Sequence, residues 1–392
     1  MKRSETKRAA TVGVVCISTY LVNYYLRHIL SVLTPRMLET GSFTVEHIGV
    51  LSSAYMLLYA SGQLVNGFLG DRLSPKKMVS TGIVWAGLSA AAFAFANSGV
   101  LQILCFALLG FGLSMVRGPL MKTISENTKP NHARTICVFF SFASFAGPLL
   151  ASLFAMLNNW RWVFLAAGGI AVFMGISAYL VLDTMEKRGQ LAYRNTKGQG
   201  LSSALGVFKI EKFGFYMVIA CIVEIGGASI SFWIPTYLTE VLGFDKEKAN
   251  LIFSACAAVR SFVPFIALAI FRATKEKDIA MMRWAYVVVT MMFACLLIAP
   301  NRWVSLVCLQ IALMAMGCSS ALLWSIYIPG LGKTGKVSSV NGVLDCTGYI
   351  AAALANLLFA GLMAGAGWNA IYVLWAGIGV TGLAATFFGG KK

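Results

Sequence analysis

Charged side chains are scarce in this sequence: Asp, Glu, Lys and Arg make up 12% of its 392 residues, whereas hydrophobic residues make up 58%. Ordinary soluble domains carry about twice that charged fraction, so an ordinary soluble globule is excluded. The sequence also lacks a nucleotide-binding loop, a catalytic triad and any Cys/His cluster with metal-ligand spacing. These absences argue against an ATP-driven machine, an enzyme and a metalloprotein, and we expect no cofactor.

Long apolar runs are what the sequence has in abundance. Most of them extend over about 20 or more residues, enough for a helix to cross a bilayer. We therefore predict an all-α membrane protein with twelve transmembrane helices, whose weakest divisions fall at residues 97–98 and 364–367. The predicted spans are residues 10–38, 45–70, 78–97, 99–121, 135–158, 162–182, 213–241, 247–271, 279–299, 302–328, 336–364 and 368–388.

Basic residues are distributed unevenly between the two sides of these spans. With both termini on one side, 24 Lys and Arg residues lie on that side and 5 on the other. This is the positive-inside pattern, which predicts an inner-membrane protein with both termini in the cytoplasm. Residues 1–8 then form a short cytoplasmic tail rather than a cleaved signal peptide. The net charge of +17 follows from topology, so we expect no nucleic acid partner.

The spans fall into two related groups of six. The most polar long segment, residues 184–212, separates an N-terminal half (1–183) from a C-terminal half (213–392) and is predicted to be a cytoplasmic linker. Residues 27–38 align with residues 227–238 at a constant offset of 200, matching at a serine, a proline and a leucine. Parallel internal repeats of this kind are typical of transporters that bind substrate at the membrane midplane.

Five charged side chains lie well inside the apolar stretches: Arg27, Arg117, Glu224, Arg260 and Asp345. A charge at the bilayer centre costs at least about 2.5 kcal/mol, and such residues normally face a polar interior on a substrate or ion path. Because these three cations and two carboxylates come from helices of both halves, we predict that they line one polar cavity. A polar cavity inside a membrane protein indicates a transporter.

Arg27 is the predicted anion ligand, because a guanidinium can hold a carboxylate, sulfonate or phosphate with two hydrogen bonds. Tyr24 lies one turn before it. A structural ion pair with Glu224 or Asp345 is the alternative. Arg260 is a candidate second anion ligand, or else it only neutralises Glu224.

Glu224 and Asp345 are the candidate proton carriers, because burial favours a neutral carboxyl group. Arg117 and Asp345 lie at matching depth, displaced toward the cytoplasmic ends of spans four and eleven. This matching depth predicts a gating pair. Four aromatic residues are further candidates for the substrate site, although packing is the commoner role for such rings: Tyr59, Trp233, Trp324 and Tyr349.

The second span ends in a motif of small residues followed by Asp71, Arg72 and a basic loop. A carboxylate there suits a latch, which would cap a helix or form an ion pair while the cytoplasmic side is closed. An ordinary helix end is the alternative. We predict gating roles for Asp71 and Arg72.

This motif carries a family resemblance: the run Gly67, Asp71, Arg72, Lys76 and Lys77 resembles the loop 2–3 motif of the major facilitator superfamily. The residues around Arg27 resemble those of its organophosphate:phosphate antiporters and of the related anion:cation symporters. The resemblance implies that Arg27 binds the substrate anion, and that Gln63, at the position of a span-two lysine in the phosphate antiporters, belongs to the substrate site. Their second arginine falls on Gly227.

Taken with the resemblance, the sequence predicts a secondary transporter that moves a small carboxylate, sulfonate or zwitterion by alternating access. A proton or a counter-anion would be the coupling partner, and we expect a monomer in the lipid bilayer. The alternatives are an organophosphate:phosphate antiporter, a multidrug exporter, and a sensor that does not transport.

Overall fold

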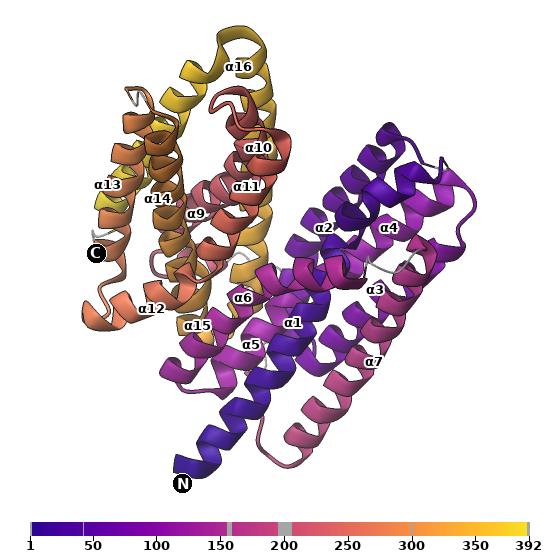
Figure 1. Ribbon diagram of the computed structural model, residues 1–392. Helices are drawn as coiled ribbons and strands as arrows, with labels where there is room; N and C mark the ends of the chain where they lie inside the picture. The colour runs from indigo at the N-terminus through magenta and orange to yellow at the C-terminus, as the bar shows by residue number, and fades with distance from the viewer. Residues whose placement is uncertain (1, 42, 155–158, 195–205, 299–300, 390–392) are drawn as a thin grey trace. The chain divides into compact units, whose positions relative to one another are not determined.

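The computed structural model describes residues 2–41, 43–154, 159–194, 206–298 and 301–389, and every regular element in these ranges is helical (Figure 1). Eleven helical stretches are long and apolar enough to cross a membrane, and the shorter apolar helix Phe213–Gly227 is a further candidate. The predicted all-α fold with twelve spans is confirmed. The predicted span ends at residues 158 and 299, and residues 195–205 of the predicted linker, lie outside the described residues.

Contacts between residues divide the chain into two compact units. Unit 1 comprises Met1–Val207 and Ile328–Cys346, and unit 2 comprises Phe208–Tyr327 and Thr347–Lys392. The first boundary falls inside the predicted linker. Residues 328–346, which the sequence assigns to the second half, pack with unit 1. The division at residues 183 and 213 stays a prediction.

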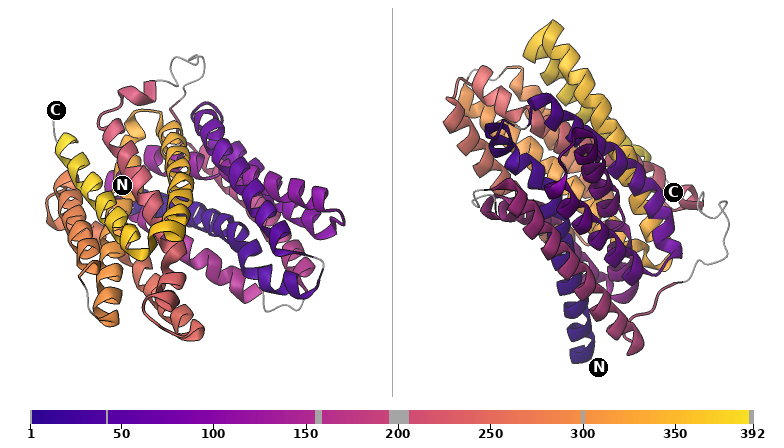
Figure 2. Two further views of the ribbon diagram at one scale, coloured as in Figure 1. Left: turned by 90° about the horizontal axis from the view of Figure 1, so that it is seen from above. Right: turned by 90° about the vertical axis from the view of Figure 1, so that its right-hand side faces the viewer.

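Unit 1 is built from long helices that pack in neighbouring pairs. Helix α3 runs along α7, α1 along α6, and α2 along α4 (Figures 1 and 2). The helices are α1 (Lys2–Glu39), α2 (Val45–Arg72), α3 (Pro75–Phe95), α4 (Gly99–Ser114), α5 (Arg117–Asn127), α6 (Pro130–Phe154) and α7 (Trp160–Lys187). The short α15 (Ile328–Gly330) and η4 (Leu331–Lys333) and the first ten residues of α16 (Val337–Phe388) complete the unit.

Unit 2 has shorter segments. Helix α13 packs along α14, and α12 also contacts α14. The elements are α9 (Phe213–Glu224), η2 (Ile225–Ile230), α10 (Ser231–Glu240), α11 (Lys246–Ser261), α12 (Val263–Ala273), α13 (Asp278–Leu296), α14 (Arg302–Ala321), η3 (Leu322–Tyr327) and the rest of α16. The short helix η1 (Gly206–Lys209) crosses the unit boundary.

Prolines explain where four spans are interrupted. A proline ring clashes with the carbonyl group four residues earlier and cannot donate a hydrogen bond to it. The break between α4 and α5 precedes Pro119, and the break between α11 and α12 precedes Pro264. The π-helical segments η2 and η3 precede Pro235 and Pro329 in the same way. Single π-helical turns inside α-helices often occur at functional sites.

Gly367 divides α16 into the last two spans. Its backbone has φ 70° and ψ −166°, a conformation open mainly to glycine. The two apolar stretches on either side are Val337–Phe359 and Gly367–Phe388. The predicted division at residues 364–367 therefore agrees with the structure.

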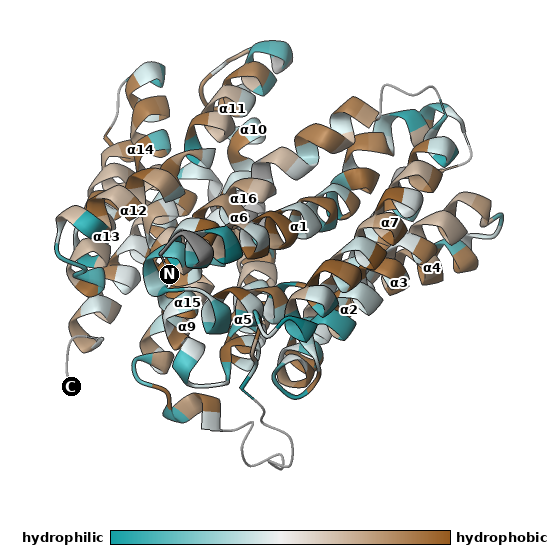
Figure 3. Cartoon of the chain, turned by 90° about the horizontal axis from the view of Figure 1, so that it is seen from below, coloured by the Kyte–Doolittle hydropathy of each residue, from teal (hydrophilic) through white to brown (hydrophobic). Residues whose placement is uncertain are grey.

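Apolar residues face outward along many spans. Phe95 and Val100 are 70% and 79% exposed, and Leu57 is 69% exposed. Figure 3 shows hydrophobic residues along α3 and α7 and hydrophilic residues at the N-terminal end of α1. Apolar surface of this extent meets lipid rather than water, as expected of a multi-pass membrane protein.

Candidate functional site

Arg27 lies on α1 in unit 1, between two tyrosine rings. Its Nη1 donates to the hydroxyl oxygen of Tyr59 at 3.4 Å, and its guanidinium carbon lies 4.9 Å from the centre of that ring. The centre of the Tyr24 ring, one helical turn earlier, is 5.6 Å away, and this ring also stacks on His28. Aromatic faces attract a guanidinium, so these two rings position Arg27.

Arg117 and Asp345 form a buried ion pair within unit 1. Nη1 of Arg117 lies 2.5 Å from Oδ1 of Asp345, whose side chain is fully buried. Asn341 lies one turn before Asp345 on α16, and its Nδ2 donates to Oδ2 at 2.8 Å. The structure thus brings together the two residues that sequence depth suggested as a pair.

Buried amide side chains on α2 and α16 carry polar atoms that have no partner among the described residues. Gln63, one turn after Tyr59 on α2, is 1% exposed. Among the described residues, its Nε2 and the Oδ1 of Asn341 have no hydrogen-bond partner. Buried polar atoms are normally paired, and a ligand or water can satisfy both.

Asp71 caps the N-terminus of α16. Its carboxylate accepts hydrogen bonds from the backbone N–H groups of Ser338 at 3.0 Å and Ser339 at 2.8 Å. The first N–H groups of a helix have no partner within the helix and carry partial positive charge, so a carboxylate there is stabilising. The predicted latch residue therefore holds the start of span eleven, 267 residues away along the chain.

Glycines allow the two helices to approach closely at this point. A Cβ atom placed on Gly67 of α2 would come within 2.8 Å of the Cα of Gly342 on α16. One placed on Gly342 would meet the carbonyl oxygen of Gln63 at 2.3 Å. Any side chain at either position would push the backbones apart and draw Asp71 away from its partners.

The end of α2 is held by a second buried cation that the sequence assigned to a loop. Lys122 on α5 is 1% exposed, and its Nζ donates to the backbone oxygen of Asp71 at 2.7 Å. Arg72 is the last residue of α2 and, with Lys122 and Glu186, lines a small pocket of about 210 Å³.

The start of the predicted linker packs against the C-terminal end of α5 in unit 1. The N–H of Ala192 donates to Oδ1 of Asn127 at 2.7 Å, and the N–H of Arg194 donates to Oε2 of Glu126 at 2.9 Å. The Arg194 guanidinium also donates to the backbone oxygen of Lys333. Between them, Tyr193 lines the small pocket, where burial raises the pKa of its hydroxyl. The linker therefore ties α5 to the segment that precedes α16.

Glu224 is the carboxylate of unit 2. It is the last residue of α9, directly before the π-helical segment η2. A Cβ atom added to Gly348 of α16 would lie 2.5 Å from Cγ of Glu224. Glu224 therefore packs against α16 at a position where that helix has no side chain. Tyr349, the next residue of α16, is half-buried.

Gly227, the repeat partner of Arg27, lies in η2 and is exposed. A Cβ atom added there would meet no atom within 4 Å. Arg260 lies in the last turn of α11, with its guanidinium carbon 5.9 Å from the Phe253 ring. In unit 2, Trp233 lies on α10 and Trp324 lies buried in η3. The substrate-binding roles of these residues stay predictions.

Sequence reasoning missed several residues of this arrangement. Lys122 reads as an ordinary loop lysine, and the partners of Asp71 include two backbone N–H groups, which have no side-chain signature. The polar stretch Ser338-Ser339-Val-Asn341-Gly342 at the start of an apolar span is a signal that points to the contact. Within the described ranges, no group of three or more His, Cys, Asp or Glu side chains is placed to hold a metal ion.

Comparisons with known proteins give the family. The model of the Major Facilitator Superfamily matches residues 16–353. The chain is 23% identical to the probable sulfoacetate transporter SauU of Cupriavidus necator, over 99% of this chain and 95% of that protein. It is 25% identical to the phosphoglycerate transporter protein of Salmonella typhimurium, over 92% and 84% of the two chains.

Solved structures give the same fold. The Major Facilitator Superfamily transporter FucP, in its outward conformation, matches with a TM-score of 0.75 and 13% sequence identity, over 97% of this chain and 99% of that one. This likeness concerns the fold alone, while the family model covers most of the sequence. The chain belongs to the Major Facilitator Superfamily.

Proposed function

We propose that this protein is a secondary transporter of a small organic anion, such as a sulfonate or a carboxylate, and that Arg27 binds the anion. The observation that carries the proposal is the placement of Arg27 between Tyr24 and Tyr59, on a membrane-spanning helix. A guanidinium desolvated by aromatic rings binds an oxyanion more strongly than one in water does.

The relatives support an anionic substrate. Two of them are named as a probable sulfoacetate transporter and a phosphoglycerate transporter, and both of these compounds carry an acidic oxyanion group. Both relatives align over most of their length with this chain. We place the protein in the cytoplasmic membrane with both termini in the cytoplasm, because most of the basic residues lie on that side.

Glu224 is the proposed proton carrier. It lies half-buried at the end of α9, directly before η2, and an apolar, membrane-embedded position favours its neutral form. A carboxyl group that releases and takes up a proton during the cycle would couple transport to the pH gradient. Asp345 is less suited to this role, because it is already paired with the Arg117 guanidinium at 2.5 Å.

Asp71 is the proposed latch of the cycle. Its two hydrogen bonds to the start of α16 are charge-assisted, which makes them stronger than neutral hydrogen bonds. We infer that these bonds hold the cytoplasmic end closed and break when it opens, so that the latch sets the rate of the conformational step.

Asp71→Asn should slow transport far more than it weakens substrate binding, because weaker bonds to the start of α16 destabilise the closed cytoplasmic end and slow the step that closes it. An amide retains one acceptor but loses the charge, and we expect exchange to slow about ten-fold, which corresponds to about 1.4 kcal/mol. The measurement is the exchange rate in proteoliposomes alongside the dissociation constant in detergent. Asp245→Asn, at an exposed carboxylate, is the matched control. An unchanged exchange rate would reduce the Asp71 region to a structural anchor.

An organophosphate:phosphate exchanger is the alternative function, and the similarity to a phosphoglycerate transporter favours it. The chain has Gly227 where the repeat would place a second arginine. Of the two repeat positions, only the first holds an arginine, Arg27, and the carboxylate of Glu224 lies one turn from Gly227 at the second. This arrangement suits an anion of lower charge than a phosphate ester, or a zwitterion. Arg260 is the residue that could supply a second guanidinium.

A substrate panel separates these two functions. Monocarboxylates, sulfonates, amino-acid-like zwitterions and sugar phosphates are offered to proteoliposomes with and without a pH gradient. We expect uptake of a sulfonate or carboxylate that rises when the outside is made acidic, and loss of this pH effect in Glu224→Gln. Exchange of sugar phosphates for inorganic phosphate without any effect of the gradient would favour the exchanger.

The Gly227→Arg variant tests whether a second guanidinium at this position selects doubly charged anions. The site has room for a side chain, because no atom lies within 4 Å of an added Cβ. A second guanidinium should shift preference toward doubly charged anions by about ten-fold, the scale of one charge-assisted hydrogen bond. Gly227→Gln is the control of similar length without charge, and an equal shift in both variants would contradict a role for charge.

A further inference from the structure

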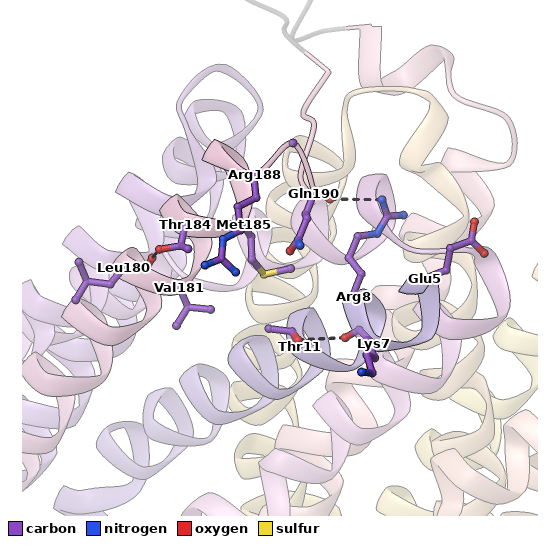
Figure 4. A pocket seen from close by; sticks show the side chains of 11 residues that line it. Glu5, Lys7, Arg8, Thr11, Leu180, Val181, Thr184, Met185, Arg188 and Gln190 are labelled. Atoms are coloured by element: carbon purple, nitrogen blue, oxygen red, sulfur yellow. Dashed lines mark hydrogen bonds between the residues drawn. The ribbon is translucent and has the colours of Figure 1, made fainter. Parts of the chain in front are cut away.

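Unit 1 has a pocket that the proposed transport cycle does not use. It has a volume of about 880 Å³ and lies between the N-terminal part of α1 and the C-terminal part of α7 (Figure 4). We call it the basic pocket and define it by Lys7, Arg8 and Thr11 from α1 and Leu180, Thr184 and Arg188 from the α7 end. The two helices pack against each other beyond it.

The pocket combines three cations with one carboxylate that is already engaged. Glu5 also lines the pocket, but its Oε2 lies 2.5 Å from Nζ of Lys129. Nη1 of Arg8 donates to the backbone oxygen of Gln190 at 3.5 Å, as Figure 4 shows. The Nε of Arg8 is buried and has no hydrogen-bond partner among the described residues. Buried donors of this kind require an acceptor, and the surplus positive charge selects an anionic one.

The wall of the pocket continues as an apolar stripe. Phe173, Ile176 and Leu180 are 71%, 51% and 57% exposed, and their spacing of three and four residues places them on one face of α7. On α1, Val14 is 68% exposed and shares a face with Lys7 for the same reason. In a membrane-spanning unit, such a face meets acyl chains.

We propose that the basic pocket binds the phosphodiester headgroup of an anionic glycerophospholipid, whose acyl chain lies along the apolar stripe. Lys and Arg side chains bind phosphate oxygens well, and basic pockets between helix ends at a membrane surface suit lipid headgroups. A free phosphate would use the cations but leave the apolar wall uncovered. The two parts together therefore point to a lipid. This inference does not depend on the proposed substrate.

Binding should stabilise unit 1. The lipid would bridge the ends of α1 and α7, and α7 also carries Asp183, whose Oδ1 lies 2.7 Å from Nζ of Lys76 on α3. The test uses delipidated full-length protein in neutral detergent, titrated with phosphatidylglycerol, phosphatidylcholine or the deacylated headgroup glycerophosphoglycerol. We expect phosphatidylglycerol to raise the melting temperature, and the other two to have little effect.

Three variants test the pocket itself. Lys7→Gln/Arg8→Gln/Arg188→Gln should weaken phosphatidylglycerol binding by about ten-fold to a hundred-fold, because each surface cation contributes a several-fold factor. Lys7→Arg/Arg8→Lys/Arg188→Lys keeps the charge and should keep binding. The matched control removes three exposed lysines from the same predicted face outside the pocket: Lys209→Gln/Lys275→Gln/Lys277→Gln.

Several outcomes would overturn the proposal. If the control triple loses as much phosphatidylglycerol binding as the glutamine triple, the attraction is a general effect of charge. If phosphatidylcholine stabilises the protein as much as phosphatidylglycerol does, the charge of the headgroup is not recognised. Equal stabilisation by glycerophosphoglycerol would make this a site for a soluble phosphate ester. If the glutamine triple does not yield folded protein, Arg188→Gln alone decides: about five-fold weaker binding supports the site, and unchanged binding contradicts it.

Discussion

Arg27→Ala is expected to abolish binding of the transported anion while leaving the solubilised protein folded. The variant removes the guanidinium that lies between Tyr24 and Tyr59. Hydrogen bonds to charged groups contribute about 1.5–3 kcal/mol each, so loss of a two-bond contact should weaken binding by at least about a hundred-fold. Calorimetric titration and ligand-induced thermal stabilisation measure the effect.

Two further variants make the Arg27 result specific. Arg27→Lys keeps the charge but cannot donate two parallel hydrogen bonds, so we expect binding intermediate between that of wild type and that of the alanine variant. Arg161→Ala removes an exposed arginine at the start of α7 that also lies beside an aromatic ring, and it should bind like wild type. Thermal stabilisation of Arg27→Ala equal to that of wild type would eliminate Arg27 as the anion ligand.

The second large effect is expected on stability, at the buried ion pair. Arg117→Ala leaves the fully buried carboxylate of Asp345 without the guanidinium that lies 2.5 Å from it. Removing one partner of a buried pair costs about 3–5 kcal/mol, whereas replacing both partners by apolar residues is often nearly neutral. We therefore expect a marked fall in melting temperature for Arg117→Ala and substantial recovery in Arg117→Leu/Asp345→Leu.

An exposed ion pair supplies the control. Nζ of Lys248 lies 3.0 Å from Oδ2 of Asp245, and both side chains are more than two-thirds exposed. Exposed pairs contribute about 0–1 kcal/mol, so Lys248→Ala should melt close to wild type. If Arg117→Ala also melts like wild type, the buried carboxylate of Asp345 does not depend on Arg117, and the prediction is wrong.

The parts of this protein that follow from short-range patterns could be predicted from its sequence. Runs of apolar residues determine the spans, and the division of the last helix at Gly367 follows from a short stretch of small residues. Arg117 and Asp345 could be paired because both are costly to bury alone and lie at the same depth. The depth of a residue in the membrane depends on its position along its helix, and this position can be counted from the sequence.

The contacts of Asp71 and Lys122 could not be predicted, for a physical reason. Asp71 bonds to the backbone N–H groups of Ser338 and Ser339, and every residue except proline has such a group, so the polar stretch around these serines does not by itself identify the partner of Asp71. The buried ammonium group of Lys122 likewise donates a hydrogen bond to a backbone oxygen, that of Asp71. Both contacts depend on how closely α2 approaches α16, which in turn depends on two glycines far apart in the chain, Gly67 and Gly342.

The most direct test of the proposed function is counterflow of a labelled anion in proteoliposomes. Vesicles containing purified protein are loaded with an unlabelled sulfonate, sulfoacetate being the first choice, and diluted into a trace of the labelled compound. A secondary transporter that binds the anion through Arg27 should accumulate label transiently, and Arg27→Ala vesicles should not. Absence of accumulation for every sulfonate and carboxylate tried, or equal accumulation in the Arg27→Ala vesicles, would contradict the account.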